Sequence, residues 1–155
     1  MKILILSVGS RPPEWVRRGF EEYTKRMPPE CRVELVEIAP AKRSKTMPPE
    51  RLREQESERI LAALPKGARV VALEVGGKSW STEALAERLE SWQLEGRDIA
   101  LLVGGPDGLA PACRSRADEL WSLSPLTLPH MLVRILLAEQ LYRAWSITRG
   151  HPYHK

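Results

Sequence analysis

The chain alternates between short apolar runs and longer stretches in which apolar residues recur every three or four positions. Apolar runs of about four to eight residues are typical of buried strands, and the longer spacing is typical of amphipathic helices. The strands that this pattern predicts are 3–8, 33–38, 69–75, 99–103 and, more weakly, 120–123. The predicted helices occupy 14–27, 49–64, 82–95 and 131–148.

This alternation predicts the fold class. Strands separated by helices need crossover connections, which give a mostly parallel sheet with helices on both faces. We therefore expect an α/β fold, in a single domain over 1–155 because no linker or repeat divides the chain. Helix 49–64 is expected to pack loosely, since Glu56 interrupts its apolar stripe, whereas helix 131–148 is apolar around more than half its circumference and needs cover.

The charge balance is mildly basic, with 24 Lys and Arg against 20 Asp and Glu and a net charge of +4. Such a bias permits a nucleic-acid partner but does not require one, because the effect depends on clustering. One cluster, Lys42, Arg43 and Lys45, lies in a proline-bounded loop. It is equally consistent with a solvated loop and with an RNA contact.

Other features narrow the location and the chemistry. No apolar run is long enough to span a membrane, and the amino-terminal run is too short for a secretory signal, so we expect a cytoplasmic protein with no membrane partner. Cys31 and Cys113 are isolated. Without a Cys-x-x-Cys pair or a third ligand near the "HPYH" ending, we expect neither a disulfide framework nor a metal.

The segment "LLVGGPDGL" (101–109) is a predicted strand that runs into three glycines and a proline. It lacks the Gly-Lys-Ser/Thr of a phosphate-binding loop and the G-x-G-x-x-G dinucleotide pattern. In open α/β sheets ligands bind beyond the carboxyl ends of the strands. The segments 73–77 and "SLSPLTLPH" (122–130) follow two further strands, although Gly76-Gly77 is equally a plain turn and the prolines ordinary loop residues. Together these ends favour a pocket for a flat, uncharged ring such as adenine.

The sequence resembles a known family over essentially its whole length. The residues that carry the likeness are "LLVGGPDGL", "ILSVGS" (5–10) and "LWSLSPLTLPHMLVRILLAEQLYRAWSITRGHPYHK" (120–155). They are similar to the ribosomal large-subunit pseudouridine N3-methyltransferase family of the SPOUT superfamily. The resemblance implies S-adenosylmethionine bound in a trefoil-knotted carboxyl-terminal region, a homodimer, and methyl transfer to N3 of a pseudouridine in 23S ribosomal RNA. From topology alone we would expect an unknotted sheet.

The resemblance also assigns a cofactor site by position. The implied cofactor-binding residues are Leu73, Gly104, Gly105, Leu123, Ser124, Pro125, Leu126, Thr127 and Leu128. We expect the two glycines to let the backbone approach the cofactor, because a Cβ would occupy the ligand's space or forbid the φ of the turn.

The acceptor nitrogen carries a proton, so a general base or a charge-stabilising donor is needed. The histidines are the candidates: His130 at a helix start whose positive end favours the neutral ring, and His154 with Tyr153 on the tail, where Tyr153 could stack on an extruded base. His130 is equally a helix cap, and the tail could be merely solvated. Arg134 is the candidate for an RNA phosphate or a pyrimidine carbonyl.

Two other classes of function stay open at this point. One is a ribosome-associated protein that binds RNA without chemistry, and the other is a nucleotide-binding regulatory module. If the chain is an enzyme, its small size and modest charge give weak capture of free RNA. We therefore expect the assembled ribosome to be the substrate.

Overall fold

The computed structural model describes all residues, 1–155. Its strands are β1 (Lys2–Val8), β2 (Arg32–Ile38), β3 (Arg69–Ser79), β4 (Ile99–Val103) and β5 (Glu119–Ser122). They form one sheet in the order β2-β1-β4-β3-β5, and every neighbouring pair is parallel. The predicted α/β class and all five predicted strands are confirmed.

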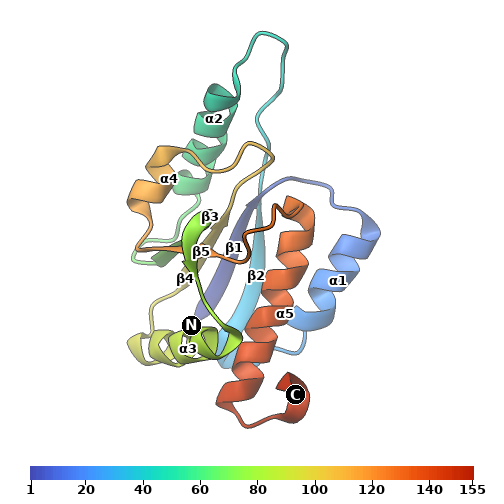
Figure 1. Cartoon of the computed structure of the whole chain (residues 1–155), viewed down its shortest axis with the longest axis vertical. Helices are drawn as coiled ribbons and strands as arrows, with labels where there is room; N and C mark the ends of the chain where they lie inside the picture. The colour runs from blue at the N-terminus through green and yellow to red at the C-terminus, as the bar shows by residue number, and fades with distance from the viewer.

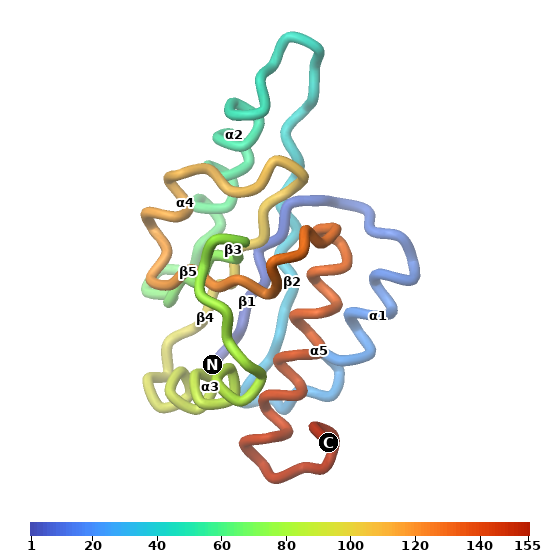
Figure 2. Tube along the Cα trace, viewed as in Figure 1, coloured from blue at the N-terminus to red at the C-terminus, as the bar shows by residue number.

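Helices cover both faces of this sheet (Figure 1). They are α1 (Glu14–Thr24), α2 (Pro49–Ala62), α3 (Thr82–Glu95), α4 (Pro111–Arg116) and α5 (His130–Thr148), with short 3-10 turns at Pro29–Cys31 and Pro152–His154. The trace in Figure 2 shows α1 and α5 side by side, and the core residues place them with α3 on one face and α2 with α4 on the other. The strand β1 contributes to the core on both faces of the sheet. Ile3 and Ile5 face α1, α3 and α5, whereas Leu4 and Leu6 face α2 and α4.

Local signals explain where several helices begin and end. The Ser81 hydroxyl accepts a hydrogen bond from the Ala84 amide at 3.0 Å, and Gly96 ends α3 in the left-handed conformation at φ +78°. Prolines precede or open α1, α2 and α4. The apolar surface of α5 packs against α1 and α3, so most of the cover that the sequence predicts for this helix comes from the same chain. No helix combines the length and the apolar character that crossing a membrane requires.

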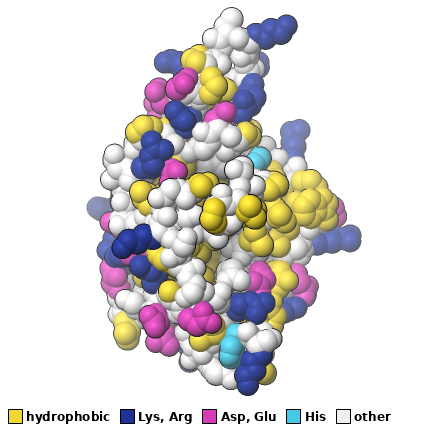
Figure 3. All heavy atoms as spheres, in the orientation of Figure 1, with side chains coloured by type: hydrophobic (Ala, Val, Ile, Leu, Met, Phe, Trp, Pro, Cys, Tyr) yellow, Lys and Arg dark blue, Asp and Glu magenta, His cyan; other side chains and the backbone are white.

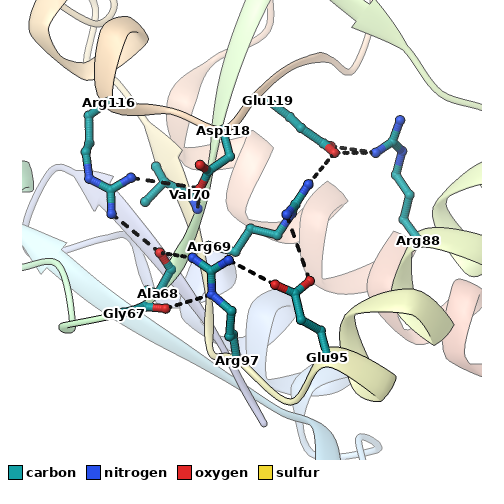
Figure 4. Close-up of polar contacts among 10 residues, drawn as sticks. All are labelled: Gly67, Ala68, Arg69, Val70, Arg88, Glu95, Arg97, Arg116, Asp118 and Glu119. Carbon is teal, nitrogen blue, oxygen red and sulfur yellow. Dashed lines mark hydrogen bonds and ion pairs between the residues drawn. The ribbon is translucent and has the colours of Figure 1, made fainter.

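An ion-pair network fixes the short edge strand β5 (Figure 4). The Glu119 carboxylate accepts hydrogen bonds from Arg69 at 2.9 Å and from Arg88 at 2.6 Å, which ties β5 to β3 and α3. The Val70 amide donates to Asp118 at 2.8 Å. The network lies where β3 and β5 begin, at the opposite edge of the sheet from their carboxyl ends.

Two expectations about the fold are wrong. Gly76-Gly77 is not a plain turn, because β3 continues through it to Ser79 with a register shift, so that both Leu73 and Lys78 lie opposite Trp121. A Cβ on Gly77 would lie 2.7 Å from the Leu120 carbonyl carbon, which explains the glycine. The shift leaves a four-residue bulge, 74–77, at the carboxyl edge of the sheet.

The helix α2 is also not loosely packed. Glu56 is only 3% exposed and lies on the same buried face as Leu52 and Ile60. Its Oε2 accepts a hydrogen bond from the Ala41 amide at 3.0 Å. A carboxylate that finds an internal donor can occupy a buried stripe, which sequence periodicity alone does not register. The trefoil knot stays a prediction.

Candidate active site

A cavity of about 550 Å³ opens at the carboxyl edge of the sheet. Its walls come from the ends of β3 and β4, the loop after β5 and the first turn of α5. They include eight of the nine residues that the sequence assigns to the cofactor: Leu73, Gly104, Gly105, Leu123, Ser124, Leu126, Thr127 and Leu128. Pro125, the ninth, is exposed and does not line the cavity. Three strand ends thus meet as the sequence predicts.

The walls of the cavity consist mainly of apolar side chains and backbone atoms. No lysine or arginine lines the cavity, and its titratable groups are Glu74 and His130. Among the lining residues, the buried Nε1 of Trp121 has no hydrogen-bond partner, which is costly. The buried Oε1 of Glu74 lies 3.5 Å from Nη1 of Arg114. Apolar walls with these few polar groups make the cavity suitable for a ligand with a neutral ring and a few polar substituents.

The loop after β5 is shaped by its own hydrogen bonds. The Ser124 hydroxyl accepts from the Leu126 amide at 2.9 Å, and the Ser122 hydroxyl donates to the Ser124 carbonyl at 3.2 Å. Leu126 is 70% exposed at the cavity rim. Ser124 therefore holds the loop in place, and Leu126 presents a free apolar side chain beside the opening.

The two glycines show a close approach that the sequence did not predict. A Cβ on Gly104 would lie 2.6 Å from the Gly108 carbonyl carbon, and one on Gly105 would lie 3.0 Å from Val8 Cγ1 and 3.3 Å from Glu56 Oε1. Neither glycine has a positive φ; Gly108 does, at +79°. The close approach seen here is of the protein's own chain. The expectation that φ forbids a Cβ is wrong, and the expectation that a Cβ would occupy the cofactor's space stays a prediction. The tight packing presents backbone to the cavity.

His130 is the first residue of α5 and lines the cavity. Burial lowers its pKa from the ordinary histidine value, and the positive charge of Arg134 lowers it further against the opposing charge of Glu56. The expected neutral ring thus has burial, rather than the helix dipole, as its main cause. No side chain caps the amino terminus of α5, so the alternative that His130 is a helix cap is wrong.

Arg134 lies one turn further along α5 and is only 1% exposed. Its Nε donates to the Ser7 hydroxyl at 3.1 Å and its Nη2 to the Gly9 carbonyl at 3.0 Å, while Nη1 lies 3.7 Å from the Glu37 carboxylate. The guanidinium is therefore fixed to the end of β1. This burial does not suit the expected contact with an RNA phosphate, and it places a fixed positive charge beside His130.

The carboxyl-terminal tail folds back on the last turns of α5. The Tyr153 hydroxyl donates to Glu139 at 2.9 Å, and its ring meets Tyr142 edge-on at 4.6 Å. Burial and the Glu139 bond raise the pKa of Tyr153 to about 12. His154 Nδ1 lies 2.7 Å from the His151 carbonyl oxygen, so the tail is a short packed turn rather than a solvated strand of chain.

The four candidate catalytic residues fall into two groups. His130 and Arg134 lie at the first turns of α5, beside the cavity, and Tyr153 and His154 lie at its far end (Figure 1). The tail folds back along α5 as far as Glu139, nine residues after His130, so at about 1.5 Å per residue the Tyr153 hydroxyl lies roughly 14 Å along the helix axis from His130, and neither Tyr153 nor His154 lines the cavity. Within one chain the tail does not reach the cavity.

Comparison with known proteins places this architecture. A family model described as "Predicted SPOUT methyltransferase" matches residues 1–154, which is nearly the whole chain. The chain belongs to the SPOUT methyltransferase family. A curated relative from Hahella chejuensis (strain KCTC 2396), named "Ribosomal RNA large subunit methyltransferase H", is 57% identical over 155 residues, covering 100% of this chain and 99% of the relative.

Two solved structures share the fold of this SPOUT methyltransferase. One, described as a probable methylase family protein from Haemophilus influenzae Rd KW20, has a TM-score of 0.57 at 12% identity, covering 99% of this chain and 70% of that one. The other, assigned to a methylase family from Neisseria gonorrhoeae, has a TM-score of 0.52 at 13% identity, covering 91% of this chain and 80% of that one. At these identities they support the fold alone.

Sequence reasoning missed one residue of this SPOUT methyltransferase that touches several parts of the site. Glu56 bonds the Ala41 amide through Oε2, while its buried Oε1 has no hydrogen-bond partner and faces Gly105. The available signal is an acidic residue in the middle of an apolar stripe, which periodicity alone interprets as a break in the stripe. No group of three or more His, Cys, Asp or Glu side chains gathers where it could hold a metal.

Proposed function

We propose that this SPOUT methyltransferase binds S-adenosylmethionine in the cavity and methylates N3 of a pseudouridine in 23S ribosomal RNA. The observation that carries the proposal is the convergence of eight of the nine implied cofactor residues on one cavity. The relative named as a ribosomal RNA large subunit methyltransferase, at 57% identity over the whole chain, supports the RNA substrate. We infer that residues 1–155 act as one catalytic domain, in the cytoplasm where ribosomes are found.

The residues of the cavity fit this cofactor. Apolar side chains such as Leu73, Leu123 and Leu128 can cover the faces of an adenine, and the backbone of Gly104 and Gly105 can meet its edge. The Glu74 carboxylate, whose Oε1 lies 3.5 Å from Nη1 of Arg114, can accept hydrogen bonds from ribose hydroxyls or an ammonium group. The absence of lysine and arginine from the walls suits a ligand without phosphates. When bound, the cofactor supplies an activated methyl group on a sulfonium.

The chain's own residues must then orient the acceptor and remove its proton. His130 is suited to accept a proton near neutral pH because its lowered pKa keeps the ring neutral. Arg134, fixed by Ser7 and Gly9, places a positive charge beside it that can favour an anionic acceptor. Tyr153 and His154 offer an aromatic face and a second base, but at the far end of α5.

We infer that a second copy of the chain supplies that tail, in a two-fold homodimer. Apolar side chains gather on one side of the molecule, over α1 and the first half of α5 (Figure 3), where Trp15 is 60% exposed. Val75 and Leu126, at the cavity rim, are 61% and 70% exposed. Exposed apolar patches of this kind mark interfaces. Sedimentation at micromolar concentration should give about twice the monomer mass.

The proposal is tested by incubating the protein with methyl-labelled cofactor and either assembled ribosomes or free 23S RNA. We expect labelled N3-methylpseudouridine, identified by mass spectrometry of the digested nucleosides, from ribosomes and little or none from free RNA. Isothermal titration with the cofactor separates the two classes of function. If the protein shows no heat of binding and transfers no label, the proposed enzymatic function is wrong, and a non-catalytic ribosome-associated RNA-binding protein is favoured.

A further inference from the structure

Residues 39–48, here called the basic loop, project from the carboxyl edge of the sheet beyond the start of α2 (Figures 1 and 2). The loop contains Lys42, Arg43 and Lys45, all exposed, and no acidic residue. Figure 3 shows basic side chains on this projecting end. The sequence left open whether the cluster is merely solvated or binds RNA. Its anchoring and its position decide between these alternatives.

The stem of the basic loop is fixed while its tip is free. Ala41 is buried, and its amide donates to Glu56 at 3.0 Å. Arg59 Nη1 donates to the carbonyls of Ala39 at 2.7 Å and Pro40 at 3.0 Å. Both anchoring side chains come from α2. A merely solvated loop needs no buried carboxylate at its base, so this anchoring indicates that the direction of the loop matters.

The basic loop also touches the wall of the cavity. Arg43 Nη2 lies 2.6 Å from the Asp107 carboxylate, and Asp107 stands between Pro106 and Gly108, which both line the cavity. Arg43 is the member of the cluster that has an internal ion pair; neither Lys42 nor Lys45 lies within ion-pair distance of a carboxylate. The loop therefore presents unpaired positive charge immediately beside the opening where the acceptor nucleotide must enter.

We propose that the basic loop binds the phosphodiester backbone of the RNA substrate next to the target nucleotide, with Arg43 exchanging Asp107 for an RNA phosphate. The inference rests on the proposed function, because it takes the substrate to be RNA. Phosphate contacts fix register and orientation, which the cavity walls, without lysine or arginine, do not supply. The Arg43 side chain is 54% exposed although Asp107 is only 18% exposed, so an RNA phosphate can approach the guanidinium from solvent and replace its partner.

The first test compares two charge-reversal variants of the full chain. One carries Lys42→Glu and Lys45→Glu, and the control carries Arg32→Glu and Lys66→Glu, exposed residues near the opposite edge of the sheet. Binding to ribosomal large subunits is measured by cosedimentation without cofactor, over a range of salt concentrations. Cofactor affinity is measured separately by calorimetry. If the proposed function is wrong, the unmodified protein itself will not bind the cofactor, and this result is distinct from a loss of subunit binding in the loop variant alone.

We expect the loop variant to bind large subunits at least about tenfold more weakly, with the slope of log affinity against log salt reduced by about 1.4 to 1.8 for two lost phosphate contacts. The control should change by less than about twofold, as should cofactor affinity in both variants. Equal losses in the two variants, or no loss in either, would overturn the proposal. So would a loss with an unchanged salt slope, which would indicate a protein surface of the ribosome instead.

The second test addresses the exchange of partners at Arg43. Asp107→Asn removes the internal partner of Arg43, so the free guanidinium should bind large subunits about two- to threefold more tightly, which is the direction opposite to structural damage. Arg43→Glu should weaken binding. Unchanged or weaker binding by the Asp107→Asn protein would contradict the exchange.

Discussion

The two ends of α5 differ in what they offer to catalysis. Its first turn borders a cavity with apolar and backbone walls, in which His130 and Glu74 are the titratable groups. Near its middle, Glu139 accepts a hydrogen bond from Tyr153 of the folded-back tail, beside His154, and none of these three residues lines that cavity. One end of the helix borders the cavity and has few acid–base groups, and the other holds such groups away from the cavity.

The helix keeps these groups apart, because the tail folds back along α5 only as far as Glu139, roughly 14 Å along the axis from His130. A site that needs both ends is therefore complete only when two chains meet. This separation is the physical basis for the proposed dimer, in which the packed tail of one chain would present Tyr153 and His154 to its partner in a defined shape.

The largest expected effect comes from removing residues 151–155. If the tail supplies orienting and proton-transfer groups to the partner's cavity, turnover on ribosomes should fall by at least about a hundredfold. Cofactor affinity should stay within about threefold, a difference under roughly 0.7 kcal/mol, because the tail is remote from the cavity of its own chain. Steady-state kinetics and calorimetry measure the two. Full activity would make the tail a bystander and leave His130 or solvent as the base.

Single substitutions in the tail should each cause part of this loss of turnover. His154→Ala should reproduce much of it, whereas Tyr153→Phe should lose less, because the phenylalanine ring still packs against Tyr142 while only the bond to Glu139 is lost. Lys155→Ala, at an exposed position, is the matched control. Equal losses for His154→Ala and the control would remove the special role of the histidine.

At the cavity end, Gly105→Val should weaken cofactor binding by at least about tenfold, or 1.4 kcal/mol. The added side chain must displace Val8 or Glu56, which moves the glycine loop into the cavity. Gly76→Val is the control, since a Cβ there meets nothing within 4 Å. Circular dichroism should show intact helices in both proteins. Near-normal cofactor affinity in folded Gly105→Val would contradict the tight-packing account.

The smallest effect concerns pH. Because the pKa of His130 is lowered in the folded chain, its contribution to stability is fully present above the ordinary histidine pKa and is lost as pH falls through the folded value. If His130 accepts the proton, the acid limb of turnover should lie below the ordinary histidine pKa of about 6.5. His130→Gln should remove that limb and flatten unfolding free energy against pH. An identical limb in the variant would assign it to another group.

Sequence periodicity predicted the layout well where elements are long and regular. The strands and the helices α1, α2, α3 and α5 appear at the predicted places, because buried strands and amphipathic helices leave a clear apolar pattern. The helix α4 was not predicted, because its six residues are too few to show a helical period. The extension of β3 through Gly76-Gly77 was also not predicted, because a bulge depends on pairing with the neighbouring strand, which local sequence does not show.

The candidate site was predicted in its residues more than in its physics. Resemblance located eight cavity residues. The φ argument for the two glycines is wrong, and the contacts of Gly105 with Val8 and Glu56 join residues that lie far apart in sequence. The burial of Arg134 and Glu56 depends on partners such as Ser7, Gly9 and Ala41 that no local pattern reveals. Long-range hydrogen bonds decide whether a charged residue in an apolar stripe is exposed or internal.

The most direct test of the central claim uses a dimer of two differently tagged chains, one with Gly105→Val and the other lacking residues 151–155. With the cofactor held below its weakened affinity for the Gly105→Val cavity, that homodimer should keep at most about a tenth of the unmodified activity on ribosomes, and the truncated homodimer at most about a hundredth. In the purified mixed dimer the intact cavity of one chain meets the intact tail of the other, so methyl transfer should recover to about half of the unmodified activity, one site of two. A mixed dimer as inactive as both parents would contradict a site shared between chains.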